Sequence, residues 1–209
     1  MKIINYDKNV TKKEVTDKAY EICNHASFPV EYQDVYNHLF ENDNLILKLL
    51  LTDTGDLKGF GVFEKYDLKL KDDLITMLYL SGMVIDPEYQ HKKISHDIIK
   101  KTYMEIKSDL ISLRTQNIAM AKSLLDTFND NLFMMPGMVN DSVLEYLKTS
   151  KPFEDVNKDG IIKRCYPNQL YYDLGAIKDN FNKDLESTDA LAVVIEPGVC
   201  KQKKISHFI

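Results

Sequence analysis

Residues 83–99 (MVIDPEYQHKKISHDII) have the types and the order of residues that could bind a phosphate group. A mostly apolar run ends at Ile85, a stretch containing Pro87 follows, and a helical pattern begins near Lys92. The first N–H groups of a helix have no acceptor within the helix and lie at the positive end of its dipole, so they attract anions. We therefore expect a strand–loop–helix anion site, a pattern that many α/β proteins share.

The other residues that could carry chemistry show no spacing typical of a metal site or an activated nucleophile. His91 and His96 are five positions apart, so they would not share one face of a helix, and the three cysteines include no C-x-x-C pair. Residues 155–160 match the first half of a calcium loop, but Tyr166 stands where the bidentate glutamate is needed. We expect no metal, a polar turn at residues 155–160, and free thiols in a reducing cytoplasm.

Composition favours a single folded domain and disfavours nucleic acid as a partner. The chain has 209 residues, of which 44% are hydrophobic and 28% charged, close to the averages for soluble domains. Its net charge of −5 provides no basic field for a phosphate backbone. The first twenty residues lack the apolar stretch of a secretory signal, and no apolar run reaches the roughly 18 residues of a membrane span. We expect a cytoplasmic protein with no membrane partner.

Hydrophobic spacing predicts alternating strands and helices that would position the anion site. Thr11 and Glu14 form a capping box that begins a helix. The predicted elements are, in order, a strand at 2–6, helices at 11–26 and 30–41, strands at 44–52, 57–66 and 74–85, a helix at 92–108, a strand at 110–114 and a helix at 117–128. Beyond these, we predict a helix at 141–147 and strands at 161–172 and 190–196 that complete the same sheet. The order indicates an α/β fold of the α+β type.

Two motifs in this frame resemble the GNAT family of N-acetyltransferases. That family has a strand ending near a proline and then Q/R-x-x-G-x-G/A at the start of the next helix; here these are Val84 to Pro87 and Gln90 to Ser95. A second motif is a strand ending in an asparagine that opens a helix, which is Asn117 here. The order of elements agrees with the family over residues 1–130. The resemblance implies one domain over 1–209, with a core at 1–130 and C-terminal strands and an inserted helix at 131–209.

The resemblance also implies a mixed central sheet with helices on both faces, and acetyl-CoA as a co-substrate. The backbone of Met83 and Ile85, on either side of Val84, is similar to the pair of strand residues that binds pantetheine in the family. Asn117 is similar to the side chain that contacts the pantetheine arm or the departing thiol. The N–H groups that would surround the pyrophosphate belong to Gln90, His91, Lys92, Lys93, Ile94, Ser95 and His96.

The sequence departs from the family pattern at the loop and at the catalytic positions. Lys93 and Ser95 replace the motif glycines, and the lysine would either supply charge to a phosphate or crowd the loop. The family's glutamate base falls on Tyr79, and its tyrosine acid falls on Leu124. Tyr79 would either relay a proton through water or simply pack as an aromatic side chain, and Glu64 is a second candidate base or else a solvated carboxylate.

These observations leave functions of different classes open. The first is an N-acyltransferase that moves an acetyl group from acetyl-CoA to a primary amine on a small molecule or peptide by direct attack. The second is a catalytically degenerate acyl-CoA-binding or regulatory module, and the third is an α/β interaction protein without such a site. A homodimer is an open alternative to a monomer.

Overall fold

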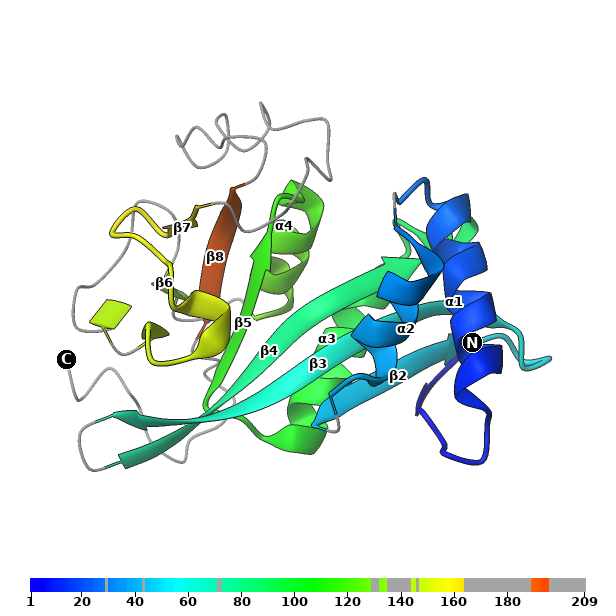
Figure 1. Cartoon of the computed structure of the whole chain (residues 1–209), viewed down its shortest axis with the longest axis horizontal. Helices are drawn as coiled ribbons and strands as arrows, with labels where there is room; N and C mark the ends of the chain where they lie inside the picture. The colour runs from blue at the N-terminus through cyan, green and yellow to red at the C-terminus, as the bar shows by residue number, and fades with distance from the viewer. Residues whose placement is uncertain are drawn as a thin grey trace. The chain divides into compact units, whose positions relative to one another are not determined.

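The structure is a computed structural model, and it describes residues 1–28, 30–42, 44–70, 73–128, 132–134, 144–145, 147–163 and 189–195. The chain divides into two compact units. Unit 1 comprises Met1–Lys65 and Leu80–Thr102, and unit 2 comprises Tyr66–Tyr79 and Tyr103–Ile209. The long strands β3 (Leu57–Leu70) and β4 (Asp73–Ile85) contribute to both units (Figure 1). The predicted single domain is not tested by this division and stays a prediction.

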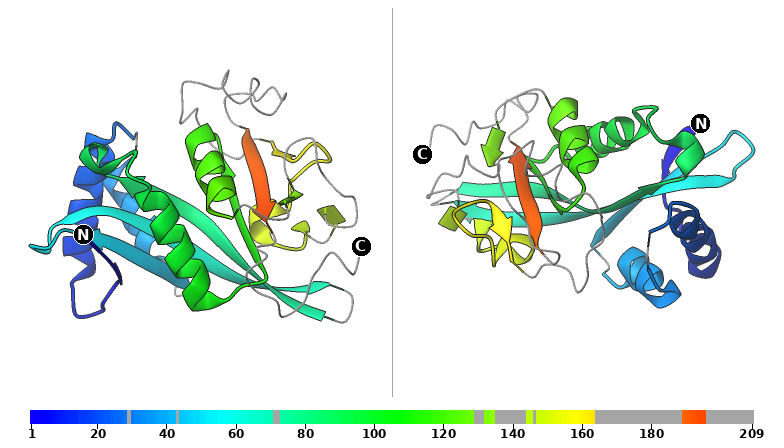
Figure 2. Two further views of the ribbon diagram at one scale, coloured as in Figure 1. Left: turned by 180° about the vertical axis from the view of Figure 1, so that it is seen from behind. Right: turned by 90° about the horizontal axis from the view of Figure 1, so that it is seen from above.

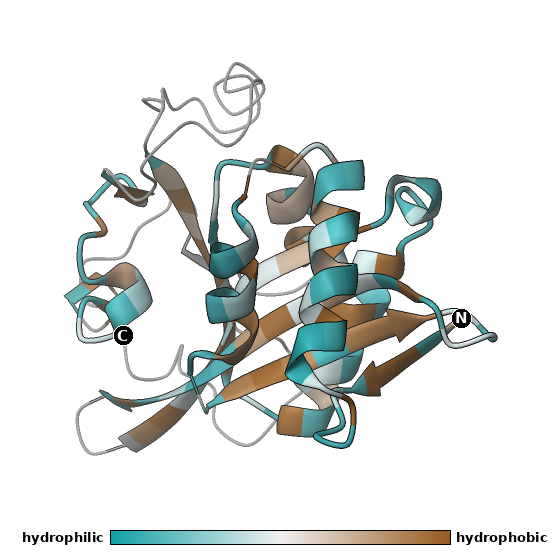
Figure 3. Cartoon of the chain, turned by 45° about the vertical axis from the view of Figure 1, so that its right-hand side comes forward, coloured by the Kyte–Doolittle hydropathy of each residue, from teal (hydrophilic) through white to brown (hydrophobic). Residues whose placement is uncertain are grey.

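Unit 1 is built on antiparallel pairing of β1 (Lys2–Asn5) with β2 (Leu45–Leu51) and of β2 with β3, which is followed by β4. Its helices are α1 (Lys12–His25), α2 (Tyr32–Phe40) and most of α3 (Ile94–Ile106). Helices α1 and α2 cover one face of these strands and α3 covers the other (Figure 2). The strands are largely apolar, whereas the helices alternate apolar and polar segments (Figure 3).

The alternation of side chains along β2 explains this two-sided cover. Leu47 and Leu49 belong to a buried cluster that also contains Val15 of α1 and Leu39 of α2. On the opposite face, a Cβ placed on Gly61 of β3 would lie 3.0 Å from the Ile98 side chain of α3. Successive strand residues point to opposite faces, so one strand serves both helical layers, and glycine at position 61 lets α3 approach closely.

Unit 2 contains the remaining parts of β3 and β4, followed in the sheet by β5 (Leu110–Thr115), β8 (Ala190–Ile195) and β6 (Leu132–Met134). Strand β8 is antiparallel to β5, to β6 and to the two-residue β7 (Ile161–Ile162). All six residues of β8 are fully buried, as expected of a strand inside a sheet. Helix α4 (Ile118–Thr127) contacts β5, and a short 3₁₀ helix lies at Lys151–Phe153.

The predicted fold class is confirmed, and most predicted elements of residues 1–128 are present with ends shifted by a few residues. The Thr11 cap is confirmed, because its Oγ1 accepts a hydrogen bond from the Glu14 amide at 3.2 Å. The strand predicted at 161–172 is wrong in length: β7 ends at Ile162, a turn follows at Lys163, and residues 164–172 lie outside the described residues. The turn at residues 155–160 is confirmed, since the Asn157 side chain accepts from two later amides.

Two further features belong to the C-terminal part. The helix predicted at 141–147 lies partly outside the described residues, and Leu144, Glu145 and Leu147, which are described, are helical. Strand β6 was not predicted, because three residues are too few to show a periodicity and its pairing with β8 decides its conformation. Within the part of the chain that the structure describes, no helix has the length and apolar character needed to cross a membrane.

Candidate functional site

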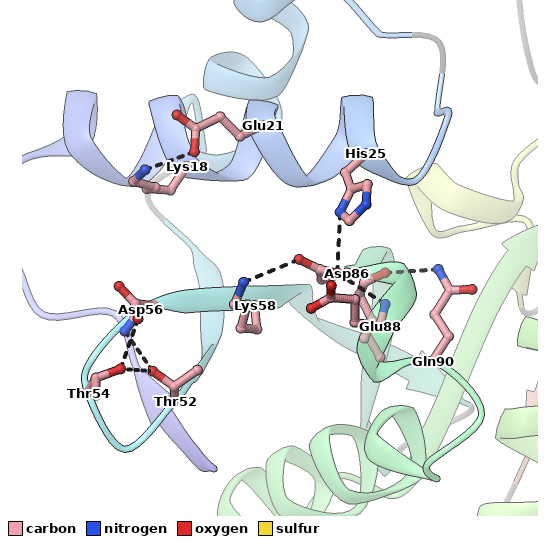
Figure 4. Close-up of polar contacts among 11 residues, drawn as sticks. Lys18, Glu21, His25, Thr52, Thr54, Asp56, Lys58, Asp86, Glu88 and Gln90 are labelled. Atoms are coloured by element: carbon pink, nitrogen blue, oxygen red, sulfur yellow. Dashed lines mark hydrogen bonds and ion pairs between the residues drawn. The ribbon is translucent and has the colours of Figure 1, made fainter.

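The end of β4 and the loop after it form the polar centre of unit 1. The Asp86 amide donates to the Lys58 carbonyl oxygen of β3 at 2.9 Å, so pairing with β3 continues one residue past the strand. The Gln90 side chain then folds back and donates through Nε2 to the Ile85 carbonyl oxygen at 2.9 Å (Figure 4). Between them lies the short 3₁₀ helix η1 (Pro87–Tyr89). The loop is therefore held at both ends by hydrogen bonds, one to the beginning of β3 and one to the last residue of β4.

Asp86 is the buried anchor of this loop, with only 5% of the residue exposed. Its Oδ1 accepts from the Glu88 amide at 3.1 Å and lies 3.3 Å from Nδ1 of His25 on α1. Its Oδ2 lies 3.6 Å from the Lys58 ammonium. A buried carboxylate needs such partners to offset its lost hydration. One side chain thus ties α1, β3 and the loop together.

Two residues of the loop have left-handed backbone conformations although neither is glycine. The φ angle is 60° at His91 and 59° at Lys93. This region costs about 1–2 kcal/mol for a residue with a Cβ atom, and such strain is concentrated at functional sites. Lys93 is one of the two positions where the GNAT motif has glycine. The loop keeps the backbone shape that glycine would provide, with a lysine in its place.

The side chains around the loop are mostly cationic. The Lys92 ammonium lies 4.8 Å from the centre of the Tyr89 ring, and the Lys58 ammonium lies 5.8 Å from the same centre. Both His91 and Lys93 are exposed. Lys92 and Lys93 immediately precede α3, where the helix dipole is also positive, and Asp97 is the one acidic residue of its first turn. Together these cations can hold an anion.

The structure brings most predicted binding residues into one segment of unit 1. Met83, Val84 and Ile85 are half-buried at the end of β4, and Gln90 to His96 form the loop and the first turn of α3. Asn117 belongs to unit 2, where it is the N-cap of α4 and its Oδ1 accepts from the Ala119 amide at 2.8 Å. Its contact with pantetheine stays a prediction, as do the binding roles of the unit 1 residues.

Tyr79 lies in the buried core of unit 2 and is 3% exposed. Its ring makes edge contacts with Tyr66 and Phe153 at centroid distances of 6.3 and 6.0 Å, and the Arg114 guanidinium lies 6.0 Å from its centre. These surroundings are those of a packing residue, which was the alternative to a proton relay. The catalytic role of Tyr79 stays a prediction, and it receives no support from this burial.

His38 of helix α2 is exposed and lies directly against β4. A Cβ placed on Gly82 would lie 2.3 Å from Nε2 of His38, and the three nearest atoms to it all belong to that imidazole. Glycine leaves room for the ring so close to the strand backbone, and a Cβ at this position would require the imidazole to move. The signal available in the sequence was a lone glycine inside an apolar strand, which indicates close approach of another group.

A cavity of about 560 Å³ lies in unit 1 beside Asp86, between α1 and strands β1 to β3. Apolar side chains of Ile4, Val15 and Leu49 line part of it. Carboxylates outnumber lysines in its lining by five to two; the seven are Asp7, Glu14, Glu21, Asp56, Asp86, Lys18 and Lys58. Figure 4 shows the polar side chains of α1 on one side and those of β3 and the β4–α3 loop on the other. The cavity therefore suits a cationic ligand with an apolar portion.

No group of three or more metal-ligating side chains is found among the described residues. Comparison by sequence finds no matching family model, and no curated protein matches the chain.

Comparison by structure does find relatives. The ribosomal-protein-S18-alanine N-acetyltransferase of Escherichia coli superposes with a TM-score of 0.54 at 12% identity, over 97% of this chain and 97% of that one. Naa20 of Chaetomium thermophilum, solved in complex with a bisubstrate analogue, superposes with a TM-score of 0.50 at 8% identity, over 94% of this chain and 86% of that one. At these identities the likeness concerns architecture. The chain has the fold of the GNAT acetyltransferases.

Proposed function

We propose that the protein is an acetyl-CoA-dependent N-acyltransferase that acts on a primary amine. The observation that carries this proposal is the pair of left-handed residues, His91 and Lys93, immediately before α3 in a chain with the GNAT fold. The backbone accepts strain at the position where this family binds a phosphate. Ser27 and Lys107, which follow the ends of α1 and α3, have the same conformation, so it is the place of His91 and Lys93 in the fold that carries the proposal.

The N–H groups of the first turn of α3 are the proposed phosphate donors. The first helical hydrogen bond of α3 runs from the Asp97 amide to the Lys93 carbonyl oxygen, so the amides of Ile94 to His96 precede it and have no acceptor within the helix. The Gln90 amide contributes less, because it donates to the Pro87 carbonyl oxygen at 3.3 Å. In this proposal the pyrophosphate of acetyl-CoA lies against residues 91–96 and the pantetheine arm follows the backbone of Met83 and Ile85.

The amine class of the acceptor is supported by the cavity beside Asp86. Its excess of carboxylates attracts a protonated amine and disfavours an anionic acceptor. Its apolar side, at Ile4 and Val15, favours an amine attached to a short aliphatic chain.

Binding is tested by calorimetric titration with acetyl-CoA at neutral pH, with one site expected. Ser95→Asp places a negative charge at the start of α3 and should weaken binding by about tenfold, since an anion there would meet another anion. Asn9→Asp adds the same charge to the exposed connection between β1 and α1 and should leave binding unchanged. No heat with millimolar acetyl-CoA, or equal effects of the two variants, would contradict this site.

Turnover is tested by the release of free CoA from acetyl-CoA in the presence of n-hexylamine, spermidine or a peptide with a free α-amino group. We expect release with at least one of these amines. Binding of acetyl-CoA without release would instead identify a GNAT-fold binding module, and the absence of both would identify an interaction protein.

A further inference from the structure

The contact between His38 and Gly82 places a titratable group next to the proposed pantetheine-binding backbone. Gly82 immediately precedes Met83 in β4. The nearest atom to the position of its missing Cβ is Nε2 of His38, at 2.3 Å, with Cδ2 and Cε1 each at 3.2 Å. The nitrogen edge of the imidazole therefore points at the strand backbone.

Helix α2 holds the imidazole in this position from its last turn. Leu39, the next residue, is 2% exposed and packs in the same core as Leu47 of β2, which anchors the end of the helix. The His38 residue itself is exposed, so solvent and a solute can reach it. An accessible imidazole next to the proposed pantetheine-binding backbone meets the first geometric demand on a general base, which is closeness to the reacting groups.

The side chains of β4 show which face of the strand this is. Val84 belongs to the core that faces α1 and α2, whereas the Met83 methyl group lies 3.3 Å from a Cβ placed on Gly61, on the face that α3 covers. Gly82 and Val84 are two residues apart and share a face. His38 thus approaches β4 from the α1 and α2 side.

We infer that His38 is the general base of the proposed acyl transfer; this inference rests on the proposed function. The acceptor reaches the site as an ammonium ion that the cavity beside Asp86 attracts. His38 is not part of the lining of that cavity, so in this proposal the nitrogen leaves the cavity for the imidazole, and Nε2 of His38 takes one of its protons. The neutral nitrogen then attacks the carbonyl carbon of the thioester. A C–N bond forms and the C–S bond breaks, the nitrogen loses its second proton to the departing sulfur, and the imidazolium returns its proton to water. The products are an amide and the free thiol of CoA.

The geometry is tested first, without any substrate. Gly82→Ala should destabilise the native chain, because its Cβ would overlap the imidazole. The same substitution should be tolerated in a His38→Ala background, since all three nearest atoms belong to that ring. The midpoint of urea unfolding, followed by circular dichroism, reports both variants. Equal destabilisation in the two backgrounds would overturn the inference.

The chemistry is tested by turnover. His38→Ala should lower kcat by about 10²–10³-fold with an unchanged Kd for acetyl-CoA, because a positioned base typically contributes that much. Added imidazole should restore part of the lost rate in proportion to its concentration, which a purely structural role would not allow. Asn37 is the adjacent residue, and its side chain accepts a hydrogen bond from Gln33 on α2. Asn37→Ala is the matched control and should retain the rate.

The outcomes separate this inference from the proposed function. Normal turnover by His38→Ala, or a loss that imidazole does not rescue, overturns the assignment of His38 as the base and leaves the proposed acyl transfer standing. A wild-type chain that binds acetyl-CoA but releases no CoA with the amines named above overturns both acyl transfer and its base.

Discussion

The two halves of β4 belong to one strand but have opposite surroundings. In the first half, Ile75, Met77 and Tyr79 are at most 3% exposed and form part of the unit 2 core. In the second half Leu80 is buried, but the five residues from Ser81 to Ile85 are all half-buried. The second half also contains Gly82, which leaves its backbone open to an approaching ring. The candidate site uses the half-buried part of the strand.

The loop after the second half adds a further contrast. The core half is stabilised by burial and ring contacts, whereas the loop depends on a few polar contacts to Asp86 and accepts strained conformations at His91 and Lys93. Stability and accessibility are thus divided along one strand. The following changes test that division, from the largest expected effect to the smallest.

Tyr79→Ala should lower the free energy of unfolding by about 3–4 kcal/mol, because truncation of a buried aromatic residue leaves a cavity. Met83→Ala, on the half-buried part of the same strand, should cost about 1 kcal/mol. Urea unfolding followed by circular dichroism measures both. Tyr79→Phe should keep both the fold and the rate of CoA release. A variant that folds normally but releases no CoA would support a catalytic role for the Tyr79 hydroxyl.

Asp86→Ala should cost about 2 kcal/mol, because it removes the acceptor of the Glu88 amide and the partner of Lys58 and His25. It should also weaken the binding of acetyl-CoA in calorimetry, since the loop loses its anchor. Asp86→Asn retains an acceptor for the Glu88 amide and should cost less. Equal losses for the two variants would show that the charge of Asp86, and not its hydrogen bond with the Glu88 amide, holds the loop.

Glu14→Gln combined with Glu21→Gln should raise the KM for n-hexylamine by about threefold at low salt. Both carboxylates line the cavity and are exposed, so each contributes a small and screened attraction. The effect should shrink at 0.5 M NaCl. Glu31→Gln removes one carboxylate outside the cavity lining, is the control for each single substitution, and should leave KM unchanged. Equal KM values for all variants would exclude the cavity as the amine site.

Lys93→Gly should raise the free energy of unfolding by less than about 1 kcal/mol. Relief of the left-handed strain stabilises the native loop, and the greater freedom of glycine in the unfolded chain offsets part of that gain. Kd for acetyl-CoA should change by less than about threefold. A tenfold loss would show that the ammonium bonds a phosphate oxygen, and binding gained only by the variant would show that the wild-type lysine blocks the site.

The sequence alone determined the order of elements through residue 128 and the place of the loop between β4 and α3. These depend on local signals: the Thr11 cap, the helical spacing of apolar residues in α3, and a proline just beyond a long apolar strand. The buried strand β8 was also predictable, because a run of six apolar residues has few alternatives.

Only the tertiary structure decided which residues of β4 face a core and which face a site. The run from Leu74 to Ile85 is apolar almost throughout, so its composition does not distinguish Tyr79 from Met83. The contact of His38 with Gly82 needed the packing of α2 on β2 and β3, because the two residues are 44 positions apart in the sequence. The role of Asp86 likewise depends on α1 and β3 meeting at one carboxylate. Local propensity places elements along the chain, but contacts between residues distant in sequence form only once the elements pack.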